Sequence, residues 1–133
     1  MKALTISQPY ASLIRSGEKW IENRRWSTNY RGLLAIHAGK GTQYLHRDEL
    51  KSYPTGCVIA VARLVAVESI ERIERFGRDV DCRLSIITGS KKRWLDANLH
   101  KHKEGPFCWI LEDVEPIEPV AINGAQGLWE WNQ

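Results

Sequence analysis

The sequence predicts a mainly β fold of the α+β class: a small mixed β-barrel of about six strands, with two or three short helices at its rim. Its strand-like runs do not alternate regularly with long helices, which disfavours a doubly wound parallel sheet. The longest run, residues 57–70, is apolar on both faces, as in a central strand of a curled sheet. The 133 residues are the size of one domain, so we expect a single domain over 1–133.

The chain opens with a strand and a short helix. Residues 2–6 form an apolar run with Thr and Ile, which predicts the strand. Ser7 or Gln8 can cap the helix, and Pro9 is tolerated in its first turn because its missing N–H would lack a partner there. Gly17 supplies the left-handed residue that ends the helix.

Three further strands are expected in the first half of the chain. They cover residues 19–26, 32–37 and 57–70. Between the last two, residues 44–53 predict a polar surface helix, which the turn signal Pro54-Thr55-Gly56 ends.

The second half is less regular. Residues 71–89 form a charged connection whose structure the sequence leaves open. Residues 107–114 predict a strand, Pro116 and Pro119 punctuate an extended edge, and residues 128–131 predict a last short strand.

The charge distribution is uneven although the net charge is only +3. Residues 1–40 and 84–103 are basic, whereas residues 104–133 are acidic. This layout fits a protein with one face toward a polyanion. It equally fits a solvated surface on which the basic and acidic segments pair with each other, and charge alone does not choose between these interpretations.

Composition excludes several classes of protein. The chain has three cysteines with no close pair, which disfavours a disulfide framework and a zinc site; we expect Cys57 and Cys108 to be small buried residues. No apolar stretch approaches the roughly 20 residues that span a bilayer, and the first residues do not form a secretory signal. We therefore expect a cytoplasmic protein without a membrane association, metal or cofactor.

The segment 16–26 carries the densest chemistry. On a strand, alternation places Trp20, Glu22, Arg24 and Trp26 on one face and directs Ile21 toward a core. Two rings, a carboxylate and a guanidinium could bind RNA bases and phosphates. The same residues could equally form an ion pair between covering tryptophans on an exposed sheet.

This segment also carries a resemblance. Gly17-x-Lys19-x-x-Glu22-x-Arg24 is similar to the GxKxxExR signature of the ASCH (activating signal cointegrator homology) domain family. Residues 4–14, 34–38, 105–111 and 127–129 also resemble elements of bacterial and phage members, in the right order. The resemblance implies a PUA-like β-barrel, with a cleft between the barrel and the first helix that the signature residues line.

Members of this family are thought to act on RNA or nucleotides. One small branch hydrolyses N4-acetylcytidine with the signature lysine, a threonine and a carboxylate. This chain keeps the lysine, as Lys19, but Glu22 stands in the place of the threonine. The resemblance therefore makes Lys19 and Glu22 candidate catalytic residues and adds Tyr10, Arg24, Trp26 and His37 as candidate ligand contacts.

Three lysine and arginine residues extend this set of candidates. Ser90 can cap a helix whose first turn holds Lys91, Lys92 and Arg93, a position that is unfavourable for the helix dipole but suitable for a phosphate contact. His37 lies on an apolar strand, where a satisfied core histidine is the plainer interpretation.

Three functions follow. The first is binding of RNA, single-stranded nucleic acid or a modified nucleoside. The second is a small hydrolase, either an amidohydrolase of the N4-acetylcytidine type or a ribonuclease, that uses Lys19 and Glu22. The third is a protein-interaction module, for which six tryptophans would supply contact area.

Overall fold

A computed structural model describes residues 1–76 and 104–132 of the chain. The elements in chain order are β1 (Lys2–Ile6), α1 (Tyr10–Ser16), β2 (Ile21–Arg24), β3 (Gly32–Ala38), η1 (Arg47–Glu49), β4 (Cys57–Ser69), α2 (Ile70–Phe76), β5 (Phe107–Ala121) and β6 (Leu128–Glu130). The strands of the described part form a six-stranded sheet in the order β2-β5-β4-β3-β1-β6. A mainly β fold with a mixed sheet and short helices confirms the predicted fold class.

The chain divides into two compact units that share β4 and β5. The first unit comprises Met1–Lys19, Leu33–Arg63 and Asp113–Gln133, and the second comprises Trp20–Gly32 and Leu64–Glu112. In the first unit the strand order is β5-β4-β3-β1-β6, and in the second it is β2-β5-β4. The expectation of a single domain over 1–133 stays a prediction.

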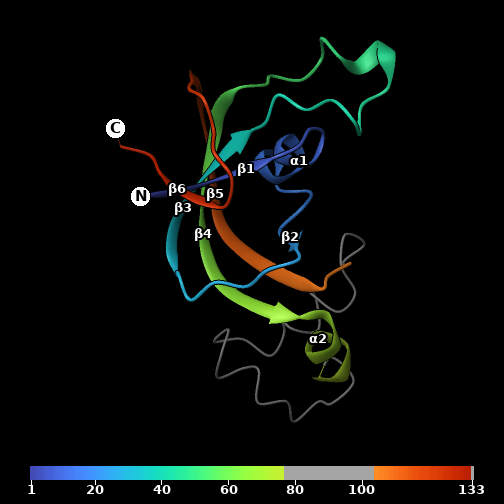
Figure 1. Ribbon diagram of the computed structural model, residues 1–133, viewed down its shortest axis with the longest axis vertical. Helices are drawn as coiled ribbons and strands as arrows, with labels where there is room; N and C mark the ends of the chain where they lie inside the picture. Colours follow the sequence, from blue (N-terminus) through green and yellow to red (C-terminus); the bar gives the residue numbers. More distant parts are fainter. Residues whose placement is uncertain (77–103, 133) are drawn as a thin grey trace. The chain divides into compact units, whose positions relative to one another are not determined.

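The first unit is built around the parallel pair of β1 and β3. Ala3 faces Ala35 and Thr5 faces His37 in this pair, while β6 adds antiparallel to the other edge of β1 (Figure 1). The buried cluster beneath these strands is formed by Ala3, Ala35, Val58 and Trp131. Small alanines beside a large tryptophan fill the space between strands that carry side chains of unequal size.

The second unit is built on the antiparallel pair of β2 and β5. Ile21 faces Ile110 in this pair, and both side chains are fully buried. They join a cluster with Ala66, Ile73 and Cys108, on which α2 packs through Ile73. Ile21 therefore points into a core, as alternation predicted, but Trp20, which precedes β2, packs against the same cluster instead of lying on the opposite face.

The N-cap position of α1 is Pro9 rather than the predicted Ser7 or Gln8, but the Gln8 side chain still accepts a hydrogen bond from the first turn. The helix begins at Tyr10 after Pro9, and the side-chain oxygen of Gln8 accepts a 2.9 Å hydrogen bond from the amide of Ser12. That bond satisfies one of the amides that a helix start leaves without a partner. Gly17 ends the helix with a φ of 88°, as predicted.

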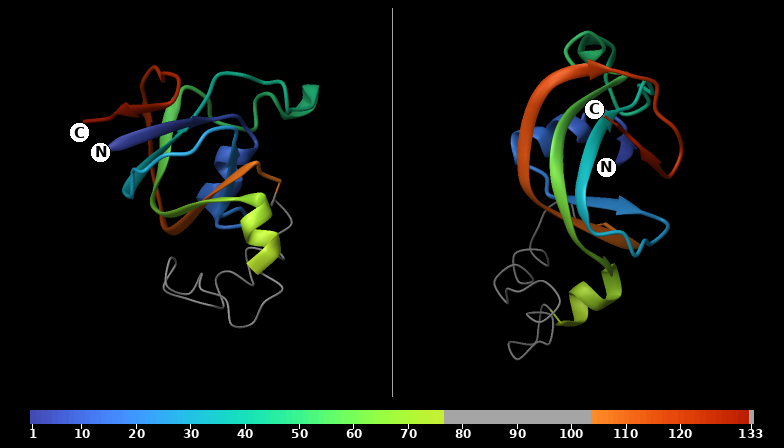
Figure 2. Two further views of the ribbon diagram at one scale, coloured as in Figure 1. Left: turned by 60° about the horizontal axis from the view of Figure 1, so that its bottom comes forward. Right: turned by 90° about the vertical axis from the view of Figure 1, so that its left-hand side faces the viewer.

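The helix predicted over residues 44–53 was wrong. This segment contains only the one-turn 3-10 helix η1, with a reciprocal capping arrangement between His46 and Glu49. None of its large apolar or aromatic side chains is fully buried: Tyr44 is 56% and Leu50 43% exposed, and Leu45 and Tyr53 are half-buried. A segment that buries no apolar face gains too little from packing to hold a longer helix. Figure 2 shows η1 on the long connection between β3 and β4.

Strand β5 is longer than predicted, because it continues through Pro116 and Pro119 to Ala121. Its register with β2 runs only from Phe107 to Ile110. Beyond that register one side of β5 is an edge, and an edge strand tolerates residues that lack an N–H donor. Of the connection that the sequence left open, residues 70–76 form α2, where the hydroxyl of Ser69 accepts a hydrogen bond from the amide of Arg72.

Candidate functional site

The candidate residues fall in both units. Tyr10, Lys19 and His37 belong to the first unit, whereas Glu22, Arg24 and Trp26 belong to the second.

Lys19 is buried to an unusual degree for a lysine, with 2% of its surface exposed. The left-handed turn at Gly17 lets the chain fold back, and the amide of Lys19 donates a 3.0 Å hydrogen bond to the carbonyl of Leu13. Its ammonium nitrogen lies 5.7 Å from the centre of the Tyr10 ring. This distance is within the range of a cation–π interaction.

A second tyrosine continues this arrangement. The rings of Tyr10 and Tyr44 have centres 5.3 Å apart and an interplanar angle of 64°. Tyr10 is half-buried, but Tyr44 is 56% exposed. We call Lys19, Tyr10 and Tyr44 the lysine–tyrosine row: a buried cation, a half-buried ring and an exposed ring.

Sequence reasoning missed Tyr44 because the segment around it was interpreted as a polar helix. The connection between β3 and β4 is instead bonded to the residues just before α1. The side-chain amide of Gln8 donates to the carbonyl of Pro54 over 2.9 Å, and that of Gln43 reaches the Ser7 hydroxyl at 3.5 Å. These long-range contacts, which no sequence pattern shows, bring Tyr44 to Tyr10.

On β2, Glu22 and Arg24 form the ion pair that alternation on one strand face allows. The Nε atom of Arg24 lies 3.1 Å from a carboxylate oxygen of Glu22, and their side chains are 24% and 10% exposed. A pair with this little solvent is screened less than one on an open surface. The pair fixes the carboxylate beside a guanidinium that keeps some access to solvent.

Trp26 stacks edge-on against the buried ring of Trp109. The ring centres are 4.8 Å apart with an interplanar angle of 83°, and the Trp109 indole N–H donates a 3.2 Å hydrogen bond to the carbonyl of Trp26. Trp26 is half-buried, so one part of the ring contributes to the packing of the second unit and the rest faces solvent.

His37 is 2% exposed and bonded at both ring nitrogens. Its Nε2 lies 2.8 Å from the carbonyl oxygen of Ile122. A carbonyl only accepts, so Nε2 carries a proton; in the neutral ring Nδ1 then accepts from the Thr5 hydroxyl, 3.1 Å away. The Thr5 oxygen in turn accepts from the Trp129 indole N–H at 3.2 Å. His37 thus links β1 and β3 to the segment that follows β5.

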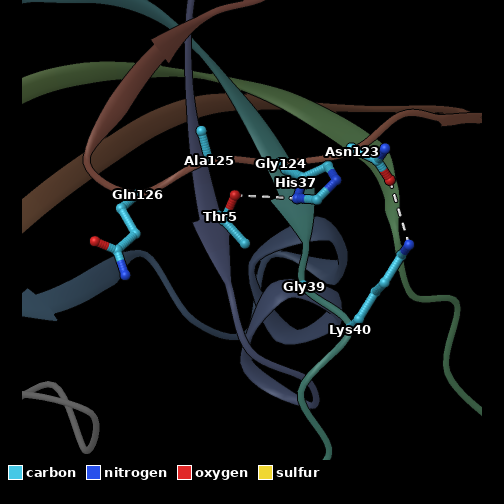
Figure 3. Close-up of a pocket in the computed structure, with 8 residues that line it drawn as sticks. All are labelled: Thr5, His37, Gly39, Lys40, Asn123, Gly124, Ala125 and Gln126. Carbon is cyan, nitrogen blue, oxygen red and sulfur yellow. Dashed lines mark hydrogen bonds between the residues drawn. The ribbon is translucent and has the colours of Figure 1, made fainter.

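A pocket of about 440 Å³ opens beside this hydrogen-bond chain in the first unit (Figure 3). The residues that line it are Thr5, His37, Gly39, Lys40, Asn123, Gly124, Ala125 and Gln126. The carboxyl ends of the parallel strands β1 and β3 meet there, as the Thr5–His37 register requires. Apart from His37, none of these residues was singled out from the sequence, because the walls come from distant parts of the chain.

The family model of the ASCH domain matches residues 4–121. The chain belongs to the ASCH domain family. The crystal structure of ASCH from Zymomonas mobilis is similar to this ASCH domain, with a TM-score of 0.56 and 18% identity over 99% of this chain and 87% of that one. Two variants of that protein are also similar. The tyrosine-to-phenylalanine variant has a TM-score of 0.53 and 18% identity over 99% of this chain and 90% of that one. The serine-to-alanine variant has a TM-score of 0.54 and 19% identity over 99% of this chain and 88% of that one. Comparison with curated proteins found no match.

The remaining candidate residues of this ASCH domain are Lys91, Lys92 and Arg93, which lie outside the described residues. Within residues 1–76 and 104–132, no three His, Cys, Asp or Glu side chains gather to hold a metal ion. No helix in that part of the chain is long and apolar enough to span a membrane. Cys57 and Cys108 are free and buried, as predicted, and burial raises the pKa of the Cys57 thiol.

Proposed function

We propose that this ASCH domain binds single-stranded RNA, and that the lysine–tyrosine row contacts it. The observation that carries the proposal is the exposed ring of Tyr44, held 5.3 Å from the Tyr10 ring, with the Lys19 ammonium 5.7 Å from the latter. Unstacked bases bind on exposed aromatic faces, and a positive charge behind the rings, as at the buried Lys19, attracts the phosphate backbone. Membership of a PUA-like family associated with RNA supports the same function.

Two residues of the second unit suit the same ligand. Arg24 keeps part of its guanidinium accessible while Glu22 fixes its orientation, and Trp26 offers a half-buried ring. We propose that Arg24 binds a phosphate or a base edge and that Trp26 adds stacking. Lys91, Lys92 and Arg93 stay proposed phosphate contacts, and His37 is assigned a positioning role.

Fluorescence anisotropy with a labelled single-stranded RNA tests this proposal. Because each stacked base contributes about 1–3 kcal/mol, Tyr44→Ala should weaken binding roughly 5- to 150-fold, whereas Tyr44→Trp should retain it. Leu50→Ala is the matched control, since it removes another exposed apolar side chain, 43% exposed, from the same connection. Wild-type affinity should fall steeply with salt because phosphate contacts release counterions.

The lysine of the row needs its own comparison. Lys19→Met removes the charge but keeps an apolar stem, and it should weaken RNA binding more than Lys51→Met, which removes a charge from an exposed position. Circular dichroism of each variant establishes that the fold is kept. Absence of wild-type RNA binding at low salt would refute the proposal and favour the protein-interaction alternative.

A second candidate function is hydrolysis, and the burial of two signature residues favours it. Lys19 is 2% and Glu22 8% exposed, although RNA contact alone would not require a cation and a carboxylate to leave water. In this function Lys19 is the base or nucleophile and Glu22 the acid–base group. Incubation with N4-acetylcytidine, followed by chromatography, tests the amidohydrolase form; turnover that Lys19→Met abolishes would support it. Labelled RNA tests the ribonuclease form, which Glu22→Gln should stop.

A further inference from the structure

The pocket at the carboxyl ends of β1 and β3 is a second candidate site, separate in its residues from the lysine–tyrosine row. We propose that it binds a nucleoside 5′-monophosphate, with the phosphate on Lys40 and the base toward Gln126. The inference rests on the pocket itself, and it survives if the lysine–tyrosine row fails to bind RNA.

The charge of the lining selects an anion. Lys40 is the charged residue among those that line the pocket, and the others are neutral polar or small residues. Its ammonium donates a 3.3 Å hydrogen bond to the side-chain oxygen of Asn123. An ammonium group carries three protons, so a phosphate oxygen can bind beside that bond. No carboxylate in the lining repels a phosphate.

The stem of Lys40 lies close to the backbone at Gly56. A Cβ atom at Gly56 would lie 3.0 Å from Lys40 Cε, so the glycine leaves room for the stem to lie against the chain. Gly56 itself is held between strands, because its amide donates to the carbonyl of Ala38 over 2.7 Å and its carbonyl accepts from Ile122 over 3.1 Å. The stem of Lys40 therefore lies against the backbone at Gly56, with its ammonium at Asn123.

The floor of the pocket is already rigid. A Cβ atom at Gly124 would lie 2.5 Å from the Thr5 hydroxyl oxygen, and one at Gly39 would lie 3.0 Å from the Thr5 methyl carbon. Both loops can therefore approach Thr5 only because they carry glycine there. The bonds from His37 to Thr5 and to Ile122 fasten the same loops together. A preformed site loses less entropy when a ligand binds.

The size and the arrangement of the polar groups select a nucleotide over a free phosphate ion. The volume of about 440 Å³ is in the range of small-molecule sites and far exceeds one phosphate group. In Figure 3, Lys40 and Asn123 lie on one side of Thr5 and His37, and Gln126 lies on the other. A carboxamide both donates and accepts, which matches the edge of a nucleobase. A ligand that reaches both sides needs an anion at one end and a base at the other.

Isothermal titration of the full chain with cytidine 5′-monophosphate, adenosine 5′-monophosphate, cytidine and inorganic phosphate tests the inference. We expect at least one of the two nucleotides to bind tenfold or more tightly than cytidine or phosphate. Lys40→Met should weaken that binding tenfold or more, while Lys51→Met, the same change at another exposed lysine, should leave it unchanged. Gln126→Leu should weaken nucleotide binding and leave inorganic phosphate binding as it was.

The inference is overturned if neither nucleotide binds more tightly than inorganic phosphate, or if Lys40→Met behaves as Lys51→Met does. The ligand can be a free nucleotide or the 5′ end of an RNA strand. Preference for a 5′-phosphorylated over a 5′-hydroxyl oligonucleotide, lost in Lys40→Met, assigns the strand end. Nucleotide binding without that preference assigns the free nucleotide. The Tyr44→Ala variant should bind the nucleotide normally, which separates this outcome from that of the RNA proposal.

Discussion

At the scale of single residues, the cost of removing charged side chains from water explains why Glu22 and Arg24 of β2 form an ion pair. Glu22 and Arg24 are each mostly shielded from solvent, and their mutual contact at 3.1 Å compensates part of the lost hydration. Such a pair contributes little net stability compared with two apolar residues, but leaving one partner alone is expensive. Glu22 and Arg24 of the signature therefore affect the stability of the fold, whatever ligand the signature binds.

A double-mutant cycle measures that consequence. Arg24→Met should lower the free energy of unfolding by about 2–4 kcal/mol, because it leaves the shielded Glu22 carboxylate without its guanidinium. The double variant Glu22→Gln with Arg24→Met should regain part of that loss. Urea denaturation of the four proteins gives the coupling energy. A fully additive double variant would show that the two side chains do not stabilise each other.

Glu68, near the end of β4, gives a second prediction at this scale. Burial raises the pKa of this carboxyl, and Arg72, 3.3 Å away, and Arg31 offset only part of that shift. The native state therefore binds the Glu68 proton more tightly than the unfolded chain, and this contribution to stability is lost as pH rises from about 4.5 through the native pKa.

Glu68→Gln should accordingly raise the melting temperature at pH 7, and its advantage should shrink as the pH falls toward 4. Thermal melts followed by circular dichroism across that range measure the difference. Glu71→Gln, at an exposed position three residues along, is the control and should show a smaller dependence on pH. A Gln variant that is less stable at neutral pH would mean that the contact with Arg72 outweighs the burial of charge.

At the scale of elements, α1 illustrates how a helix of seven residues persists. Two turns are too short to be stable by propensity. The helix is held by Ala11 and Ile14, which are fully buried, and by Arg15, whose Nε donates a 3.0 Å hydrogen bond to the carbonyl of Ile59. Its two ends are closed by Gln8 and Gly17. The end at Gly17 also sets the position of Lys19, whose amide bonds back to the carbonyl of Leu13.

Gly17→Ala should destabilise the protein by about 1–2 kcal/mol, since a residue with a Cβ disfavours the left-handed conformation that Gly17 adopts at φ 88°. Nothing lies within 4 Å of the added Cβ, so the cost is conformational. Gly17→Asn should cost less, because asparagine tolerates this conformation better. Gly41→Ala, in a loop without a positive φ, is the control for chemical denaturation, since its Cβ would meet only the far end of the Gln43 side chain, which can move aside. Equal losses at the two glycines would contradict the assignment.

At the scale of the whole molecule, the two ends of the chain complete the first unit together. The amide of Trp131 donates a 2.9 Å hydrogen bond to the carbonyl of Met1. The Glu130 carboxylate accepts a charged hydrogen bond from the Lys2 ammonium, 2.8 Å away. That hydrogen bond lowers the pKa of Glu130, so its small contribution is present above about pH 4.5 and is lost as the pH falls through the native value. The larger contribution comes from Trp131, which is 4% exposed.

Deletion of residues 128–133 should therefore lower the free energy of unfolding by about 3 kcal/mol or more, the cost typical of losing a buried aromatic side chain. It also removes Trp129, whose indole bonds Thr5. Deletion of Gln133 alone is the control. Melting curves report stability, and the nucleotide titration reports the pocket. Wild-type stability of the longer deletion would show that the first unit does not need β6.

Hydrophobic periodicity and turn-forming residues predicted those parts of the fold that depend on neighbours in sequence. Gly17 was recognised as the helix end, Ile21 as a core residue and residues 57–70, observed as Cys57–Ser69, as a long central strand, because each follows from local conformation or alternation. The helix predicted over residues 44–53 failed because its stability depended on packing that the segment does not obtain. Two of the signature residues, Lys19 and Glu22, are buried, while their roles in binding or catalysis stay predictions.

The amino-acid sequence by itself determined the fold class, the ASCH family and the residues of the signature, because these depend on the order and spacing of residues that are close together in the chain. Only the tertiary structure decided that Tyr44 meets Tyr10, that His37 joins Thr5 to Ile122, and that Lys40 and Gln126 share a pocket. These contacts join residues far apart along the chain. Strand pairing and packing set such distances, and no local pattern of residue types encodes them.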